Sequence, residues 1–152
     1  MMLKRVLLVM FLTGIFSKPV EAQDQGFGLG VILGEPSGVS GKLWFGRTTS
    51  LNGALAWSVE GENSVHVHLD YVFHDFKLMQ VEKGKLGLYY GAGGRVKFAD
   101  DSTISLRIPV GLNYLFADAP VDLFFELVPM LDLAPSTDVN ANGGIGVRYF
   151  FE

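Results

Sequence analysis

The residues most able to do chemistry lie together in the segment His66-Val67-His68-Leu69-Asp70. Alternate residues of a β-strand point to one face, so His66, His68 and Asp70 would share a face. Imidazole and carboxylate groups bind metals such as Zn²⁺ and also act as general acids and bases. Same-face neighbours are about 7 Å apart in a strand, so the three side chains converge poorly on one ion. We expect no metal site and no cofactor, and interpret the three residues as polar lining.

Charged residues that recur at the same alternation form a second candidate site. Positive and negative members are equal in number, and buried charges are tolerated when they are paired and hydrogen-bonded. We therefore predict a network of internal salt bridges, with Glu126 and Arg107 as its first members because they lie mid-strand on neighbouring strands. The set comprises Lys42, Arg95, Lys97, Arg107 and Arg148 against Glu60, Asp70, Asp122, Glu126 and Asp132.

The elements that must position these residues follow from apolar side chains that alternate with polar or small ones. Between residues 104 and 116, for example, every second residue is apolar, while Ser105, Arg107 and Asn113 fall on the other face. Turn residues separate the alternating segments. The pattern predicts an all-β protein of eight antiparallel strands with up-and-down connections. The segments are 27–33, 38–46, 51–59, 65–73, 86–98, 104–116, 121–133 and 140–151, with an irregular stretch at 74–85 that turns at Lys83-Gly84-Lys85.

The composition of the polar face indicates that it lines the inside of a closed barrel. That face is rich in glycine and poor in lysine and glutamate, unlike the surface of a soluble lipocalin-like barrel. The lumen of an eight-stranded barrel has just enough room for side chains, so small residues must alternate with large ones. The apolar face then meets lipid. We predict a transmembrane β-barrel, closed because an open edge in hydrocarbon would leave main-chain groups unpaired.

The N-terminus has the features of an export signal. Lys4 and Arg5 precede an apolar run from Val6 to Phe16, and Val20-Glu21-Ala22 fits a cleavage site. We predict a signal peptide at 1–22 and a barrel domain at 23–152. Removing residues 1–22, which hold three positive charges and one negative charge, changes the net charge from −4 to −6. A chain this acidic is a poor ligand for nucleic acid.

Aromatic residues predict how the barrel sits in the membrane. Amphipathic rings prefer the membrane interface, and most rings on the apolar face fall near one end of the barrel. If the termini are periplasmic, that end is the periplasmic one, and Trp57 and Phe98 mark the other rim. The expected periplasmic set is Phe27, Phe45, Tyr71, Phe73, Tyr114, Phe116, Tyr149 and Phe151.

The C-terminal residues Gly146-Val147-Arg148-Tyr149-Phe150-Phe151 fit a Gly-x-x-aromatic-x-aromatic pattern. In this the chain resembles the small outer-membrane β-barrels of the OmpA transmembrane-domain and OmpX type, where such a pattern is an assembly signal. The resemblance implies an outer-membrane protein of a Gram-negative cell, in contact with outer-membrane lipid and with the barrel-assembly machinery during insertion. It assigns Gly146, Tyr149 and Phe151 to the assembly signal. We expect a monomer.

Three functions fit such a barrel. The first is a structural or interaction role with a lumen filled by side chains, and the second is a narrow channel. The third is a lipid-modifying enzyme, because eight-stranded outer-membrane barrels include enzymes that trim or acylate lipid A. The deacylase type carries His-x-Ser, whereas here His66 and His68 are followed two positions on by His68 and Asp70, so the nucleophile is missing. We therefore expect no catalytic residues, and rank the structural role first.

Overall fold

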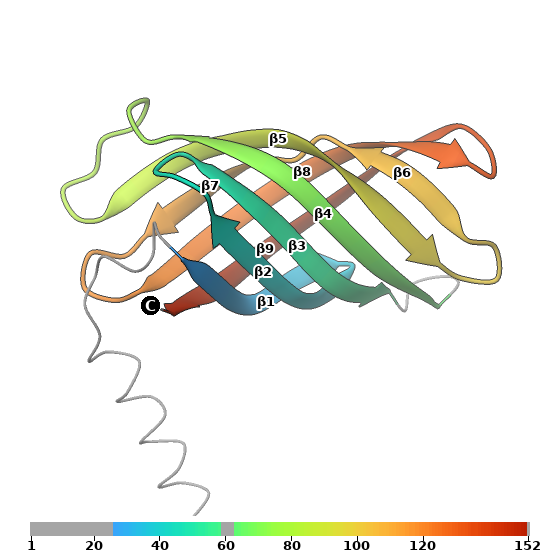
Figure 1. Cartoon of the computed structure of the whole chain (residues 1–152), viewed down its shortest axis with the longest axis horizontal. Helices are drawn as coiled ribbons and strands as arrows, with labels where there is room; N and C mark the ends of the chain where they lie inside the picture. The colour runs from blue at the N-terminus through green and yellow to red at the C-terminus, as the bar shows by residue number, and fades with distance from the viewer. Residues whose placement is uncertain (1–25, 59–62, 152) are drawn as a thin grey trace, which may run out of the picture.

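A computed structural model of the chain describes residues 26–58 and 63–151. The predicted signal peptide at 1–22, with its cleavage site, lies outside these residues. The described residues form nine strand segments in one antiparallel sheet (Figure 1). They are β1 (Phe27–Glu35), β2 (Ser37–Trp44), β3 (Thr49–Ser58), β4 (Ser64–Asp75), β5 (Lys85–Phe98), β6 (Thr103–Arg107), β7 (Val110–Leu115), β8 (Val121–Ala134) and β9 (Asp138–Phe151).

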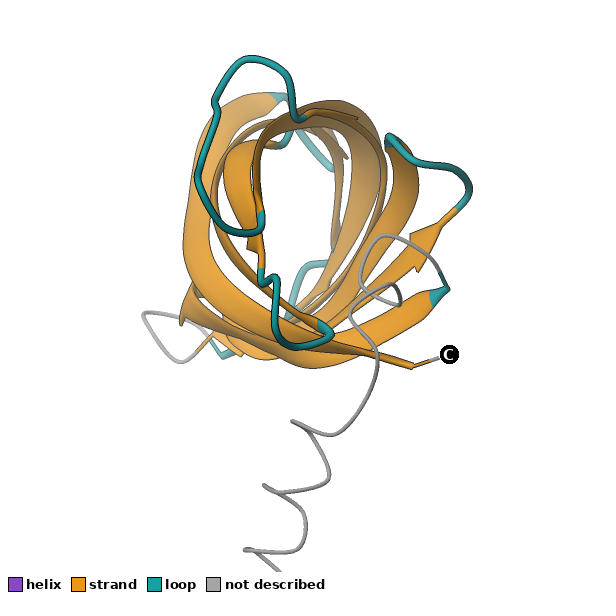
Figure 2. Cartoon of the chain, turned by 90° about the vertical axis from the view of Figure 1, so that its left-hand side faces the viewer, coloured by secondary structure: helices purple, strands orange, loops and turns teal. Residues whose placement is uncertain are grey.

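The sheet closes on itself into a barrel. Each segment pairs with two neighbouring strands of the ring, and β1 pairs with β9 along its whole length, from Phe27 opposite Phe151 to Glu35 opposite Gly143. Viewed along the barrel, the strands form a ring (Figure 2). The segments β6 and β7 both lie between β5 and β8, so the ring has eight positions. The prediction of an all-β, eight-stranded antiparallel barrel is confirmed.

The predicted continuous strand at 104–116 is instead divided between β6 and β7 by Ile108 and Pro109. The register is unchanged across the break, because Arg107 lies opposite Met130 and Val110 opposite Leu127. The Gly91 amide donates to the Pro109 carbonyl and the Ile108 amide to the Pro129 carbonyl. Proline has no N–H, so Pro109 cannot donate to Gly91 and Pro129 cannot donate to Ile108. One ladder hydrogen bond is therefore missing on each side of this strand.

The stagger of the strands follows from their registers. Passing from each residue to its partner on the next strand leads once around the barrel and back to β9, but ten residues away from the starting point. Such a stagger requires strands that tilt steeply against the barrel axis. The path runs through Phe150, Gly28, Lys42, Asn52, Asp70, Gly93, Arg107, Met130 and Asn140.

The connections divide between two ends of the barrel. The end that holds Phe27 and Phe151, which we call the terminal end, also holds the turns 45–48, 76–84 and 116–120. The opposite end, called the far end, holds Pro36, the end of β3, the start of β4 and the connections 99–102 and 135–137. The predicted irregular stretch at 74–85 is shorter than expected, because β4 keeps its alternation through Asp75 and the loop covers only 76–84. No helix in the described part of the chain is long and apolar enough to cross a membrane.

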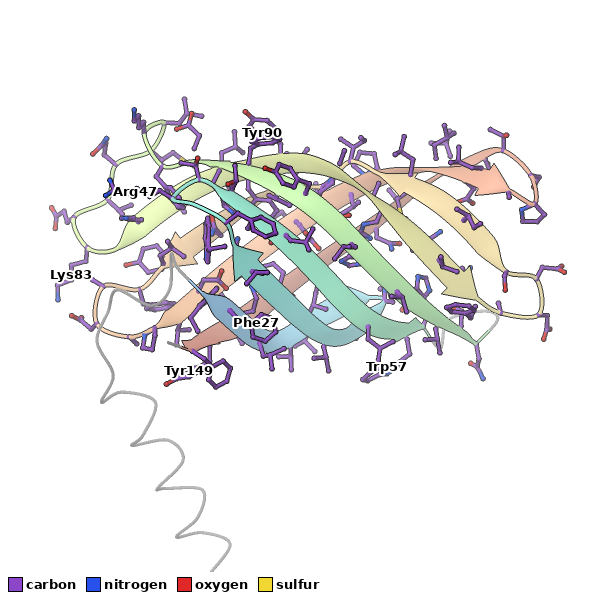
Figure 3. The ribbon with its side chains drawn as sticks, in the orientation of Figure 1. Phe27, Arg47, Trp57, Lys83, Tyr90 and Tyr149 are labelled. Carbon is purple, nitrogen blue, oxygen red and sulfur yellow. The ribbon has the colours of Figure 1, made fainter. Side chains whose placement is uncertain are left out.

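The two faces of the barrel have opposite character. Large apolar side chains cover the outside on every strand, and Leu33, Leu55, Trp57, Leu69 and Leu127 are each more than half exposed. Figure 3 shows side chains projecting outward over the full length of the barrel. The inside holds the buried charges together with serine, asparagine and histidine. The outward and inward sets follow the alternation in the sequence.

Glycines make room in the lumen for large rings. Phe150 lies over Gly28, its partner on β1, where an added Cβ would come within 2.6 Å of the ring. Tyr89 covers Gly111 in the same way, and Phe124 covers Gly146, again across a strand pair. The glycine-rich inward face is therefore the complement of the large side chains beside it.

Rings on the outer surface gather at the terminal end. Phe45, Tyr71, Phe73 and Tyr90 form a continuous row of ring contacts, with centroids 5.2 to 6.3 Å apart. Tyr114 packs on Phe116 and Tyr149 on Phe151. Phe27 and Tyr149 lie at this end and Trp57 lies toward the other (Figure 3). Tyr90 is a member of this group that the sequence pattern did not assign to it.

Candidate functional site

Three buried arginine–aspartate pairs lie inside the barrel. The Arg148 Nε atom donates to Asp122 Oδ1 at 3.0 Å, between directly opposite residues of β8 and β9. The Arg107 Nε atom donates to Asp70 Oδ1 at 3.0 Å. The side chains of both pairs are at most 2% exposed. Charges this deeply buried depend on one another, because removing one partner leaves the other without compensation.

The pair formed by Arg107 and Asp70 spans two strands. Both residues lie opposite Gly93 on β5, which stands between them, and a Cβ at Gly93 would come within 2.1 Å of Asp70. Glu126, predicted with Arg107 as a first member of the network, accepts a hydrogen bond from the Tyr89 hydroxyl at 3.0 Å. Glu126 lies opposite Gly111 on β7, four residues along from Arg107.

The third pair belongs to a larger polar cluster nearer the far end. The Arg95 Nη2 atom donates to Asp132 Oδ1 at 3.3 Å and to the Ser105 hydroxyl at 3.0 Å. Asp132 also accepts hydrogen bonds from Ser105 and Asn140. Arg95 Nη1 lies 3.3 Å from His66 Nδ1. Because an arginine only donates, His66 Nδ1 is the acceptor and its Nε2–H is free to donate to Ser64, 3.0 Å away.

Lys42 is fully buried at the opposite end of the lumen. Its Nζ atom lies 2.6 Å from His74 Nε2 and 4.4 Å from the centroid of the Trp44 ring. The His74 Nδ1 atom faces the Thr48 carbonyl at 3.1 Å. A carbonyl only accepts, so Nδ1 carries the proton and Nε2 accepts from the lysine. Lys42 is therefore held by a ring nitrogen and by aromatic faces, and not by a carboxylate as predicted.

Large rings gather around Lys42 near the terminal end of the lumen. We call this group the aromatic plug, formed by Trp44, Phe76, Tyr89, Phe124 and Phe150. Trp44 packs against Phe150, and the Arg148 guanidinium carbon lies 3.9 Å from the Phe124 ring centroid. The charges here are thus covered by aromatic faces, an arrangement that stabilises cations away from water.

Phe76 joins the plug from the loop at 76–84. Its ring centroid lies 6.4 Å from that of Trp44 and 5.8 Å from that of His74. The carboxylate of Asp75 accepts the backbone amides of Lys77 and Leu78, which fixes the turn that directs Phe76 inward. Gly87 leaves space for the ring, because a Cβ there would come within 2.7 Å of it.

The lumen contains open space near the far end. A polar cavity of about 190 Å³ lies there, and we call it the vestibule. It is lined by Glu35, Pro36, Ser58, Ser64, His66, Arg95, Lys97, Asn140, Ala141 and Asn142. A much smaller cavity of about 20 Å³ lies near Arg107 and Glu126, deeper in the barrel. Its volume suits a single water molecule.

The histidines of the candidate metal trio are engaged separately. His66 is bound to Ser64 and Arg95, and the closest approach of His68 to Asp70 is 3.9 Å. Asp70 is taken by Arg107. Within residues 26–58 and 63–151, no group of three or more histidine, aspartate or glutamate side chains is placed to hold a metal ion.

The charged residues of the candidate network occupy three situations. Six form the arginine–aspartate pairs, while Glu126 and Lys42 bind Tyr89 and His74 instead. Lys97 lies in the wall of the vestibule. Glu60, the remaining predicted member, lies outside the described residues. The aromatic plug was not anticipated, although Tyr89, Phe124 and Phe150 occupy inward positions in the alternation and large rings there were a usable signal.

The two kinds of ion pair in this chain differ in their expected effect on stability. Asp70→Asn leaves the buried Arg107 guanidinium without a counter-charge and should lower the free energy of unfolding by about 3–5 kcal/mol. The matched control is Asp118→Asn, which breaks the exposed pair with Lys83, whose side chains are 78% and 86% exposed. That change should cost less than about 0.5 kcal/mol.

The measurement is urea unfolding of protein folded in detergent, followed by tryptophan fluorescence. If the two variants shifted the unfolding midpoint equally, the ion pair between Arg107 and Asp70 would not be a dominant interaction of the lumen.

Comparison with known proteins addresses the fold. No protein-family model matches the chain, and no curated protein sequence matches it. Among solved structures, it matches the crystal structure of the N-terminal β-barrel domain of OprF from Pseudomonas aeruginosa, with a TM-score of 0.62 and 14% sequence identity. The match covers 84% of this chain and 98% of that domain. The expected resemblance to small OmpA-type barrels is therefore confirmed for the fold: the chain has the barrel fold of the OprF N-terminal domain.

Proposed function

We propose that the protein is an exported barrel of the outer membrane with a structural or interaction role and a closed lumen. The observation that supports this proposal is that the two faces of the barrel are reversed relative to those of a soluble protein. The outside presents large apolar side chains on every strand, and the inside holds paired charges. Water would solvate such an outer surface poorly, whereas lipid accommodates it.

The closed ring supports a position in lipid, because pairing of β1 with β9 leaves no open sheet edge in hydrocarbon. The rings at the terminal end support an orientation in which that end meets the periplasmic interface. The apolar run and cleavage site near the N-terminus support export. On this proposal, the partners of the mature protein are outer-membrane lipids, and the chain acts without catalysis, as a monomer.

The membrane proposal is tested by folding the mature chain from urea. Addition of detergent micelles should give a species that migrates differently on gels before and after boiling, because a closed barrel resists the gel detergent until it is heated. Without detergent or lipid the same chain should aggregate, since its outer surface is apolar. A soluble, folded monomer in plain buffer would contradict the proposal.

The aromatic plug favours a closed lumen over a channel. Trp44 and Phe150 pack together, Phe76 packs against them, and the buried Lys42 ammonium lies over the Trp44 ring. Hydrophobic constrictions of this kind exclude water and ions. The unaltered protein should therefore give no steady conductance in a planar bilayer.

Trp44→Ala should convert the closed barrel into a leaky one, with discrete current steps. Trp57→Ala is the matched control, because that indole is 53% exposed on the outer surface and its loss should leave the bilayer silent. Phe76→Ala provides a second opening variant outside the strands. Heat-dependent migration verifies that each variant is folded. Steady conductance of the unaltered protein would support the channel alternative, and silence of both opening variants would contradict the plug.

The C-terminal residues support recognition by the barrel-assembly machinery. Phe151 and Phe27 lie directly opposite one another at the terminal end and are 44% and 43% exposed. If Phe151 belongs to an assembly signal, Phe151→Ala should lower the amount of barrel in the outer-membrane fraction several-fold, while Phe27→Ala should have little effect. Equal losses would indicate that both rings act only at the lipid interface.

A further inference from the structure

The vestibule at the far end combines space, a buried arginine, a half-buried lysine and polar side chains. Its volume of about 190 Å³ exceeds that of a few water molecules but is below the range typical of sites for drug-sized ligands. Seryl and asparaginyl side chains line it together with Arg95, Lys97 and Glu35. A site of this size and polarity suits a ligand of few non-hydrogen atoms.

Arg95 is fixed in the wall of the vestibule before any ligand arrives. It is 5% exposed, and its two terminal nitrogens are used by Ser105, Asp132 and His66. Its Nε atom is buried without a hydrogen-bond partner. That nitrogen has almost no accessible surface, so Arg95 contributes positive charge to the vestibule and not a free donor. The partner carboxylate is already occupied, since Asp132 also accepts hydrogen bonds from Ser105 and Asn140.

Lys97 supplies a second positive charge. It lies directly opposite His66 on β4, two residues along β5 from Arg95, so both side chains point into the lumen on one wall. No ion pair or hydrogen bond joins the Lys97 side chain to another residue within 26–58 and 63–151. The carboxylate of Glu35 comes from the turn between β1 and β2 and accepts the Ser58 hydroxyl.

We propose that the vestibule binds a small soluble anion carrying a carboxylate or phosphate group. Lys97 provides the ammonium donors, Arg95 adds positive charge, and the neutral side chains of Ser64 and Asn142 line the same space. Charge-assisted hydrogen bonds from lysine and arginine are the usual means of holding such groups. The site faces the lumen and not the lipid, which favours a dissolved anion over a lipid headgroup. This binding role goes beyond the structural role proposed above.

The test is calorimetric titration of detergent-folded protein with inorganic phosphate and, separately, with acetate. We expect saturable binding of at least one of the two probes. Lys97→Met should weaken it about tenfold, because it removes a charge at the site. Lys83→Met is the control, since it removes the same charge from an exposed loop at the terminal end and should leave the affinity unchanged.

A variant that should change the anion affinity in the opposite direction distinguishes a binding role of Lys97 from a structural one. Glu35→Gln keeps an acceptor for Ser58 but removes the negative charge of the vestibule, so anion affinity should rise a few-fold. A purely structural Lys97 would not produce opposite changes in the two variants. Repeating the titration in micelles doped with anionic lipid should leave the affinity unchanged if the ligand is a soluble anion.

Three results would overturn the proposal: no saturable binding of either probe, equal weakening by Lys97→Met and Lys83→Met, or competition by the anionic lipid. All titrations use protein whose folding has been verified by heat-dependent migration. The outcome is therefore independent of whether the barrel conducts ions and distinguishable from a failure of the membrane proposal.

Discussion

Closure of the sheet is the constraint on which the rest of this structure depends. The pairing of β1 with β9 joins the two ends of the described chain and gives every strand two neighbours. Without it, two rows of amide and carbonyl groups would be unpaired on an apolar body. This pairing links residues more than a hundred positions apart, so the last strand must be complete before the ring exists. The aromatic C-terminus is thus also part of the closing seam.

Once the ring is closed, its circumference fixes how much can be packed inside. The lumen is filled by matching each large inward ring to a glycine on the next strand, as Phe124 is matched to Gly146 and Phe150 to Gly28. The charged side chains then occupy the lumen space that the rings leave. Arg107 reaches Asp70 across the gap at Gly93, while Lys42 finds no carboxylate and is enclosed by His74 and Trp44. The terminal half of the lumen combines large rings with buried charges, and the far half is polar and holds the vestibule.

The sequence was sufficient to predict which side chains face the lumen and which face outward, but not which side chains contact one another inside the lumen. Alternation assigns each residue to the lumen or to the outside, because the side-chain period of a strand is two whatever its neighbours are. Partners across the lumen depend on the stagger, which alternation does not encode. Glu126 and Arg107 lie on adjacent strands, yet the register separates them by four residues, and each binds another group. The division between β6 and β7 was foreshadowed by Pro109, whose missing N–H interrupts the ladder without moving the register.

The stagger of ten residues is an even number, and its parity preserves the distinction between inside and outside. A path of hydrogen-bonded partners that starts at a lumen residue, Phe150, returns to β9 at another lumen-parity position, Asn140. With an odd stagger, the same path would return to a residue facing the opposite side. Alternation along a strand and pairing around the ring would then assign the same residue to opposite faces. Apolar residues could not all lie outside and polar residues inside. A strand with one extra residue therefore keeps the two faces distinct by absorbing that residue in a local bulge, as at the register shift between Ile104 and Ser105, whereas a change of two residues alters the tilt and radius.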